Sequence, residues 1–235
     1  LIPLRFIPIT RGHAHRGGGG AGGKTVGRGG GVNLTMIVKN RRLMLLLGFG
    51  LFHFMFVSCQ NTYFSVYYAT ERGMNAGIGM YGLFFALSIS GEALVMILGH
   101  KLFSRLNVYT VFSVIPLAGS LRALIVYLAP NPYIMMVSAV FHGLMFGLLW
   151  MHAAPYIGRI VPNEMRATGQ ASWSVMVSGL GPVIGSTLGG LLTNFIDIRG
   201  VFLFVSCALS LVFIVFSFLF RRQRAIDRAE GFIAQ

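Results

Sequence analysis

The sequence predicts an all-α membrane protein whose chain crosses the bilayer six times. Of the 235 residues, 55% are hydrophobic and only 11% are charged, and the mean hydropathy is +0.72. A soluble domain has about a quarter of its residues charged, so this chain has too little polar surface to cover a water-soluble core. The apolar residues also gather in six long segments that short connections separate.

Each of the six segments has the length that a membrane helix needs. An α-helix requires about 20 apolar residues to cross about 30 Å of hydrocarbon, and it satisfies its backbone hydrogen bonds internally, as lipid requires. The connections contain residues that end helices, such as the two prolines at 130 and 132. The predicted spans cover residues 43–65, 76–100, 108–128, 133–157, 169–192 and 200–220.

Two basic regions, residues 1–42 and 222–235, flank the predicted six-helix domain at 43–221. Ten glycines lie between residues 17 and 31, and such a stretch cannot bury enough apolar surface to offset the entropy lost on ordering. We therefore expect a flexible cytoplasmic linker, and an RGG-like RNA-binding segment is the less favoured alternative. Because the chain begins with Leu1 rather than Met, we expect a fragment or a processed product.

The basic residues orient the spans. If the N-terminus lies inside, sixteen Lys and Arg fall on that side and two, Arg72 and Arg199, fall outside. Positively charged loops stay in the cytoplasm, so both termini are predicted to be cytoplasmic. We expect the plasma membrane rather than an organelle.

Three ionisable residues lie deep inside neighbouring spans: Glu92 in the second, Arg122 in the third and His142 in the fourth. At a rise of 1.5 Å per residue they fall within about 10 Å of the same depth. A charge near mid-bilayer costs about 3 kcal/mol, so such residues usually face a cavity and pair with one another. A carboxylate accepts hydrogen bonds from the hydroxyl groups of a solute, and a guanidinium donates hydrogen bonds from a rigid, forked set of N–H groups. An imidazole can relay a proton. The alternative is a buried ion pair that only locks the bundle.

Uncharged polar residues near the end of the first span are further candidates for the lining of a solute cavity, namely Gln60, Asn61 and Tyr63. In the fifth span, Gly181, Gly185 and Gly189 repeat at every fourth position, which allows close helix packing, and Pro182 predicts a kink.

Enzymatic chemistry has no support in the sequence. The two cysteines, Cys59 and Cys207, lie in apolar runs and give neither a disulfide framework nor a metal site. The glycine-rich stretch lacks the Gly-Lys-Ser/Thr of a phosphate loop, and no catalytic triad pattern is present. The sequence therefore predicts no enzyme, no cofactor and no metal, and a nucleic-acid partner is not expected.

Three features resemble the second half of a major facilitator superfamily transporter. Residues 99–106 (GHKLFSRL) resemble the basic gating loop after the second helix of each half, although the usual Asp-Arg pair is absent. Residues 161–171 (VPNEMRATGQA) are similar to the P-x-x-x-R-A-T-x-Q pattern of the nucleoside–proton symporter and phenylpropionate permease branch. The lactose permease family and that branch place a substrate-contacting Glu, an Arg and a His where this chain has Glu92, Arg122 and His142.

The resemblance implies one half of a major facilitator fold and a secondary active transporter that works by alternating access. Its solute would be a small organic molecule such as a sugar, a nucleoside or an aromatic acid, with protons as the candidate coupling ion. In the lactose permease pattern a proton-carrying Glu follows the His by three residues, where this chain has Met145. The implied gating residues are Gly99, Lys101, Arg105, Pro162 and Arg166.

Transporters of this kind need two six-helix halves with the site between them. We therefore expect a missing N-terminal half, or a second copy of this chain, as a partner within the lipid bilayer. The alternative is a non-transporting six-helix scaffold, or a truncated fragment, whose basic tether binds anionic lipid or RNA.

Overall fold

The computed structural model describes residues 38–71, 73–103 and 106–232. Most of the expected linker and Arg105 therefore lie outside the described residues. The chain divides into two units, Leu1–Asn33 and Leu34–Gln235, and the described helices all belong to the second.

Six helical segments are long and apolar enough to cross a membrane, judged by length and composition. They are α2 (Arg41–Ala69); α3 (Gly77–Phe103); α4 (Val108–Leu128); α5 (Pro132–Met136) with α6 (Ser138–Ile160); η1 (Asn163–Met165), α7 (Arg166–Ser174), η2 (Val175–Leu180) and α8 (Gly181–Leu192); and α9 (Ile198–Ala229). The predicted all-helical, six-span fold is confirmed. The ends shift by a few residues, most at α9, where residues 221–229 extend the helix beyond the predicted span.

Asparagine and aspartate side chains fix where four of the helices begin. Each accepts a hydrogen bond from a backbone N–H in the first turn, which satisfies a donor that the helix itself cannot pair. The bonds join Asn40 to Leu43 (3.1 Å), Asn107 to Tyr109 (3.0 Å), Asn131 to Ile134 (3.0 Å) and Asp197 to Gly200 (3.0 Å).

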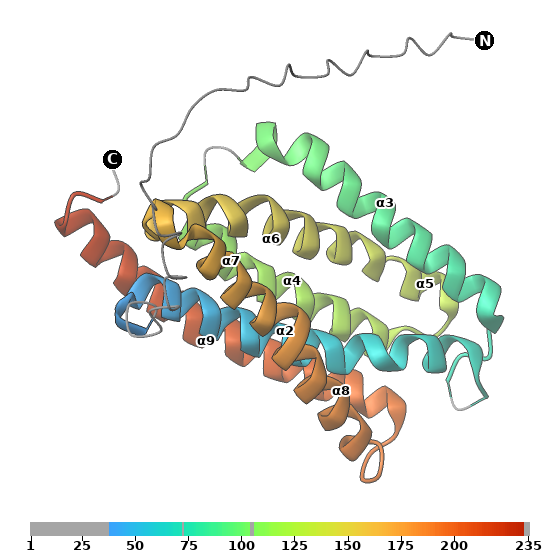
Figure 1. Ribbon diagram of the computed structural model, residues 1–235. Helices are drawn as coiled ribbons and strands as arrows, with labels where there is room; N and C mark the ends of the chain where they lie inside the picture. Colours follow the sequence, from blue (N-terminus) through green and yellow to red (C-terminus); the bar gives the residue numbers. More distant parts are fainter. Residues whose placement is uncertain (1–37, 72, 104–105, 233–235) are drawn as a thin grey trace, which may run out of the picture. The chain divides into compact units, whose positions relative to one another are not determined.

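Three pairs of helices make the main packing contacts: α4 with α9, α3 with α6, and α2 with α8 (Figure 1). Serines join the first pair. Ser120 Oγ donates to the carbonyl of Ser206 (2.9 Å), and Ser206 Oγ donates back to the carbonyl of Ser120 (3.1 Å). Hydrogen bonds of this kind hold helices together where lipid gives no hydrophobic driving force.

Glycines join α8 to α2. A Cβ atom added at Gly185 would lie 2.0 Å from the carbonyl oxygen of Met55, and one added at Gly189 would lie 2.7 Å from Tyr63 Cε2. The regular small-residue spacing therefore serves close helix contact. Pro182 lies just after the π-helical turn η2, so the expected irregularity takes the form of a widened turn before the proline.

The spans are unequally covered by the rest of the protein. In the most apolar window of α3 only 17% of the residues are buried, and in that of the fifth span only 22%. The other four windows range from 44% to 56%, because α2, α4, α6 and α9 enclose an aromatic core around Phe49, Phe112 and Phe220. Two spans thus present broad apolar faces to their surroundings.

Candidate substrate site in the membrane

A glycine contact between α3 and α6 brings the first pair of polar residues together. A Cβ atom added at Gly143 would lie 2.5 Å from the carbonyl carbon of Gly91, so the two backbones touch. The next residue on α3 is Glu92 and the preceding residue on α6 is His142. Their side chains meet, with His142 Nε2 3.8 Å from Glu92 Oε2.

The Glu92–His142 pair is partly open. The Glu92 side chain is 23% exposed and that of His142 is 10% exposed. His142 Nδ1 is buried and has no hydrogen-bond partner among the described residues, while the ring packs 4.5 Å from that of Phe146. A carboxylate beside an imidazole can accept hydrogen bonds from hydroxyl groups. When the imidazole is charged, the two side chains can also share its proton.

Arg122 lies near this pair but bonds to a different residue. Its Nη1 donates to Asn61 Oδ1 on α2 (2.9 Å), and its guanidinium lies 4.4 Å from the centre of the Phe64 ring. The side chain is buried, and its Nε has no hydrogen-bond partner among the described residues. The geometry is thus two pairs, Glu92 with His142 and Arg122 with Asn61, rather than one ion-pair triad.

The two remaining candidates on α2 have different surroundings. Gln60 is fully buried, and both polar atoms of its amide lack a hydrogen-bond partner among the described residues. An unpaired buried amide costs free energy, so an external partner for it would be stabilising. Tyr63 lies against Gly189 and Gly190 of α8, away from the Glu92–His142 pair on α3 and α6.

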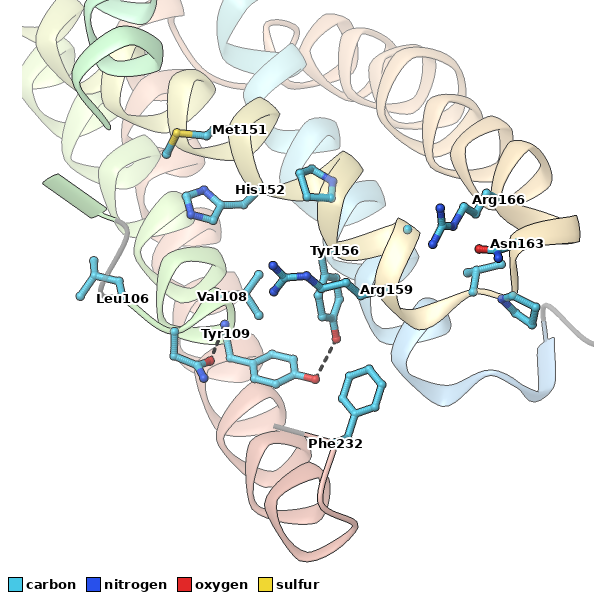
Figure 2. A pocket seen from close by; sticks show the side chains of 15 residues that line it. Leu106, Val108, Tyr109, Met151, His152, Tyr156, Arg159, Asn163, Arg166 and Phe232 are labelled. Atoms are coloured by element: carbon cyan, nitrogen blue, oxygen red, sulfur yellow. Dashed lines mark hydrogen bonds between the residues drawn. The ribbon is translucent and has the colours of Figure 1, made fainter. Parts of the chain in front are cut away.

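The residues implied to gate the site lie elsewhere in the bundle. Gly99 lies against Met151 of α6, Lys101 is exposed on the last turn of α3, and Arg105 is outside the described residues. Pro162 and Arg166 line a cavity of about 1060 Å³ at the end of the bundle where α6 finishes (Figure 2). None of the six candidate substrate residues lines this cavity.

Sequence reasoning missed a buried polar network centred on Asp227, which it had assigned to the tail. Arg42 Nε and Gln223 Nε2 both donate to Asp227 Oδ1, at 2.9 and 2.7 Å, and the hydroxyl of Tyr109 donates to Asp227 Oδ2. The hydroxyls of Tyr109 and Tyr156 are 2.8 Å apart. The sign of this network in the sequence was Asp227 itself, an isolated acid among the basic residues of 221–228.

Comparison with known proteins gives the family. The model of the MFS_1 like family matches residues 10–204. Maltose permease of Geobacillus stearothermophilus is 28% identical over 183 residues, which are 78% of this chain and 45% of that protein. Uncharacterized transporter YwbF of Bacillus subtilis (strain 168) is 22% identical over 143 residues, 61% of this chain and 35% of that protein. No solved structure matches significantly.

Six apolar helices with paired polar side chains between them define a multi-pass integral membrane protein. The chain belongs to the MFS_1 like family of the major facilitator superfamily, as its resemblance to the second half of such a transporter predicted. It spans less than half the length of the curated relatives that it matches.

Proposed function

We propose that this chain forms one half of a secondary active transporter that moves a small organic solute by alternating access. The observation that carries the proposal is the pairing of Glu92 with His142 and of Arg122 with Asn61 inside apolar spans. Ionisable groups in a membrane are costly and usually mark a solute or ion pathway. The permease and transporter names of the relatives support the same function.

The donors and acceptors of the site suit a solute rich in hydroxyl groups. Glu92 offers carboxylate oxygens and Gln60 an amide with both atoms unpaired. Arg122 keeps an unpaired Nε beside its bond to Asn61. Of the solutes expected from the sequence, a sugar fits these groups best, and the name of the maltose permease relative favours the same class.

A second six-helix half, or a second copy of this chain, would complete the site. The poorly covered faces of α3 and the fifth span are the surfaces we propose for that contact. Glu92 lies on α3, so its carboxylate would lie near the junction between the halves. The Glu92–His142 pair is the candidate for proton coupling, and the distribution of basic residues supports cytoplasmic termini in the plasma membrane.

Solute binding to the purified chain in lipid nanodiscs tests the proposal. We expect saturable binding of radiolabelled maltose, and we expect Glu92→Gln to weaken it about tenfold or more, because a charged hydrogen-bond acceptor is lost. The matched control is Glu71→Gln, which neutralises an exposed carboxylate in the turn after α2. It should leave the affinity unchanged.

Uridine and phenylpropionate serve as alternative probes, because the nucleoside and aromatic-acid classes are the other expected solutes. If Glu92→Gln and Arg122→Lys lower the melting temperature but no solute of the three classes binds the unaltered chain, either alone or as two copies in one nanodisc, the chain has no solute site of its own, as the scaffold alternative predicts. Equal effects of the variants at positions 92 and 71 would also contradict a site at Glu92.

A further inference from the structure

The polar cavity lined by Pro162 and Arg166 lies at the end of the bundle where α2 begins and α9 ends. It has a volume of about 1060 Å³ and extends along the last two turns of α6, from His152 to Arg159. The start of α4, the turn before α7 and Phe232 close its other sides (Figure 2). This volume is large enough for a small phosphorylated molecule or for a lipid headgroup.

The cavity is basic, and none of its described lining residues is acidic. Arg159 and Arg166 line it, and Figure 2 shows Arg159 extending toward the start of α4 with Arg166 beside Asn163. No carboxylate is among its lining residues, and within the described part of the chain neither arginine forms an ion pair. Among the described residues, the two guanidinium groups that line the cavity therefore have no acidic partner.

The nearest acidic groups on α9 are already engaged. Asp227 is buried and accepts from Arg42, Gln223 and Tyr109, and Glu230 pairs with Arg42 at 2.6 Å. The guanidinium of Arg42 also lies 3.9 Å above the ring of Phe232, which forms a wall of the cavity. The Asp227 network thus fixes this wall, and both Asp227 and Glu230 are already bonded to residues other than Arg159 and Arg166.

A neighbouring cavity of about 480 Å³ increases the positive charge. Val161 and Pro162 line both cavities, so the two adjoin. Three basic residues line the smaller one, Lys39, Arg41 and Arg42, and Glu230 is its one acidic lining residue. The basic residues of both cavities therefore attract anions to this end of the bundle together, rather than through one side chain.

We propose that the cavity bounded by Arg159 and Arg166 binds a phosphate group, carried either by an anionic lipid or by a soluble phosphorylated molecule. Guanidinium groups donate paired, parallel hydrogen bonds to phosphate oxygens, and such charge-assisted bonds are stronger than neutral ones. The phosphate site is separate from the proposed solute site, because Glu92, Arg122 and His142 do not line the cavity.

The test uses the purified 235-residue chain in a neutral detergent. Phosphorus NMR follows the line width of inorganic phosphate, and native mass spectrometry compares retention of dioleoyl-phosphatidylglycerol with that of dioleoyl-phosphatidylcholine. The cavity variant is Arg159→Gln with Arg166→Gln, and the matched control is Arg221→Gln with Arg222→Gln, which removes two exposed charges that line neither cavity.

We expect the cavity variant to weaken binding about tenfold or more and the control by less than about twofold. Loss of phosphate broadening in the cavity variant alone assigns the site to soluble phosphorylated molecules, and loss of phosphatidylglycerol retention alone assigns it to lipid. The variant Arg159→Lys keeps the positive charge but loses the paired N–H donors of the guanidinium, so it should bind phosphate with intermediate affinity.

The proposal is overturned if neither probe binds the unaltered chain, or if the cavity and control variants lose binding equally. Equal losses would mean that the basic surface as a whole attracts anions. Both substituted arginines are exposed, so the variants should fold, and size-exclusion chromatography checks this.

Discussion

At the scale of single residues, Asp227 is the most heavily bonded carboxylate in the described part of the chain. Its side chain is completely buried, and three donors from α2, α4 and α9 converge on it. Removing one partner of a buried charged network is costly, because the other groups keep their desolvation without their bonds. Asp227 therefore holds the start of α2 and the end of α9 together.

We predict that Asp227→Asn lowers the free energy of unfolding by about 2–3 kcal/mol, because Arg42 and Tyr109 lose a charged acceptor. The measurement is thermal unfolding in detergent, followed by fluorescence. The control is Glu230→Gln, since the Glu230 side chain is 58% exposed and its pair with Arg42 should contribute less than about 1 kcal/mol. Equal losses from the two variants would argue against a central role of Asp227.

At the scale of helices, the contact between Gly91 and Gly143 decides whether the Glu92–His142 pair can form. Only residues without a side chain allow α3 and α6 to approach this closely. The pair therefore depends on backbone packing at the neighbouring positions as well as on its own charges.

Gly143→Ala should separate α3 from α6, because the added Cβ atom would lie 2.5 Å from the backbone of Gly91. We expect a loss of about 1–3 kcal/mol in stability and a longer distance between spin labels on the two helices, measured by pulsed electron resonance. Gly82→Ala on α3 is the control, since nothing lies within 4 Å of its added Cβ. If the control lengthens the distance as much, the contact does not set the spacing.

At the scale of the whole molecule, the six described spans do not enclose the proposed substrate site. The aromatic core lies mainly among four of them, whereas only 17% and 22% of the residues in the most apolar windows of α3 and the fifth span are buried. A solute at Glu92 would therefore meet lipid on one side unless another six-helix unit covers it.

We predict that the 235-residue chain reconstituted alone into proteoliposomes shows no maltose uptake above that of empty liposomes. Alternating access needs two halves that move about a shared site, and this chain supplies six spans. Saturable uptake by the chain alone would contradict this prediction and favour a homodimer, which cross-linking in the same vesicles would then detect.

The six spans and their order could be predicted from the sequence, since helix formation in lipid depends on local composition and length. The polar residues of the candidate site were also visible, because an ionisable residue in an apolar run is conspicuous wherever it packs. Their pairing was not visible. Depth along the helices suggested that the three residues gather in one cluster, but the side chains form two pairs, and the Gly91–Gly143 contact brings the first of these pairs together.

By itself, then, the sequence determined that this chain is a six-helix membrane protein with charged groups inside its spans. The tertiary structure decided which of those groups meet, and it buried Asp227 in a polar network, although the sequence had placed this residue in a basic region after the last span. The physical reason is that span formation depends on neighbours along the chain. Side-chain pairing depends instead on how closely and at what rotation separate helices pack, and residues far apart in the sequence set that jointly.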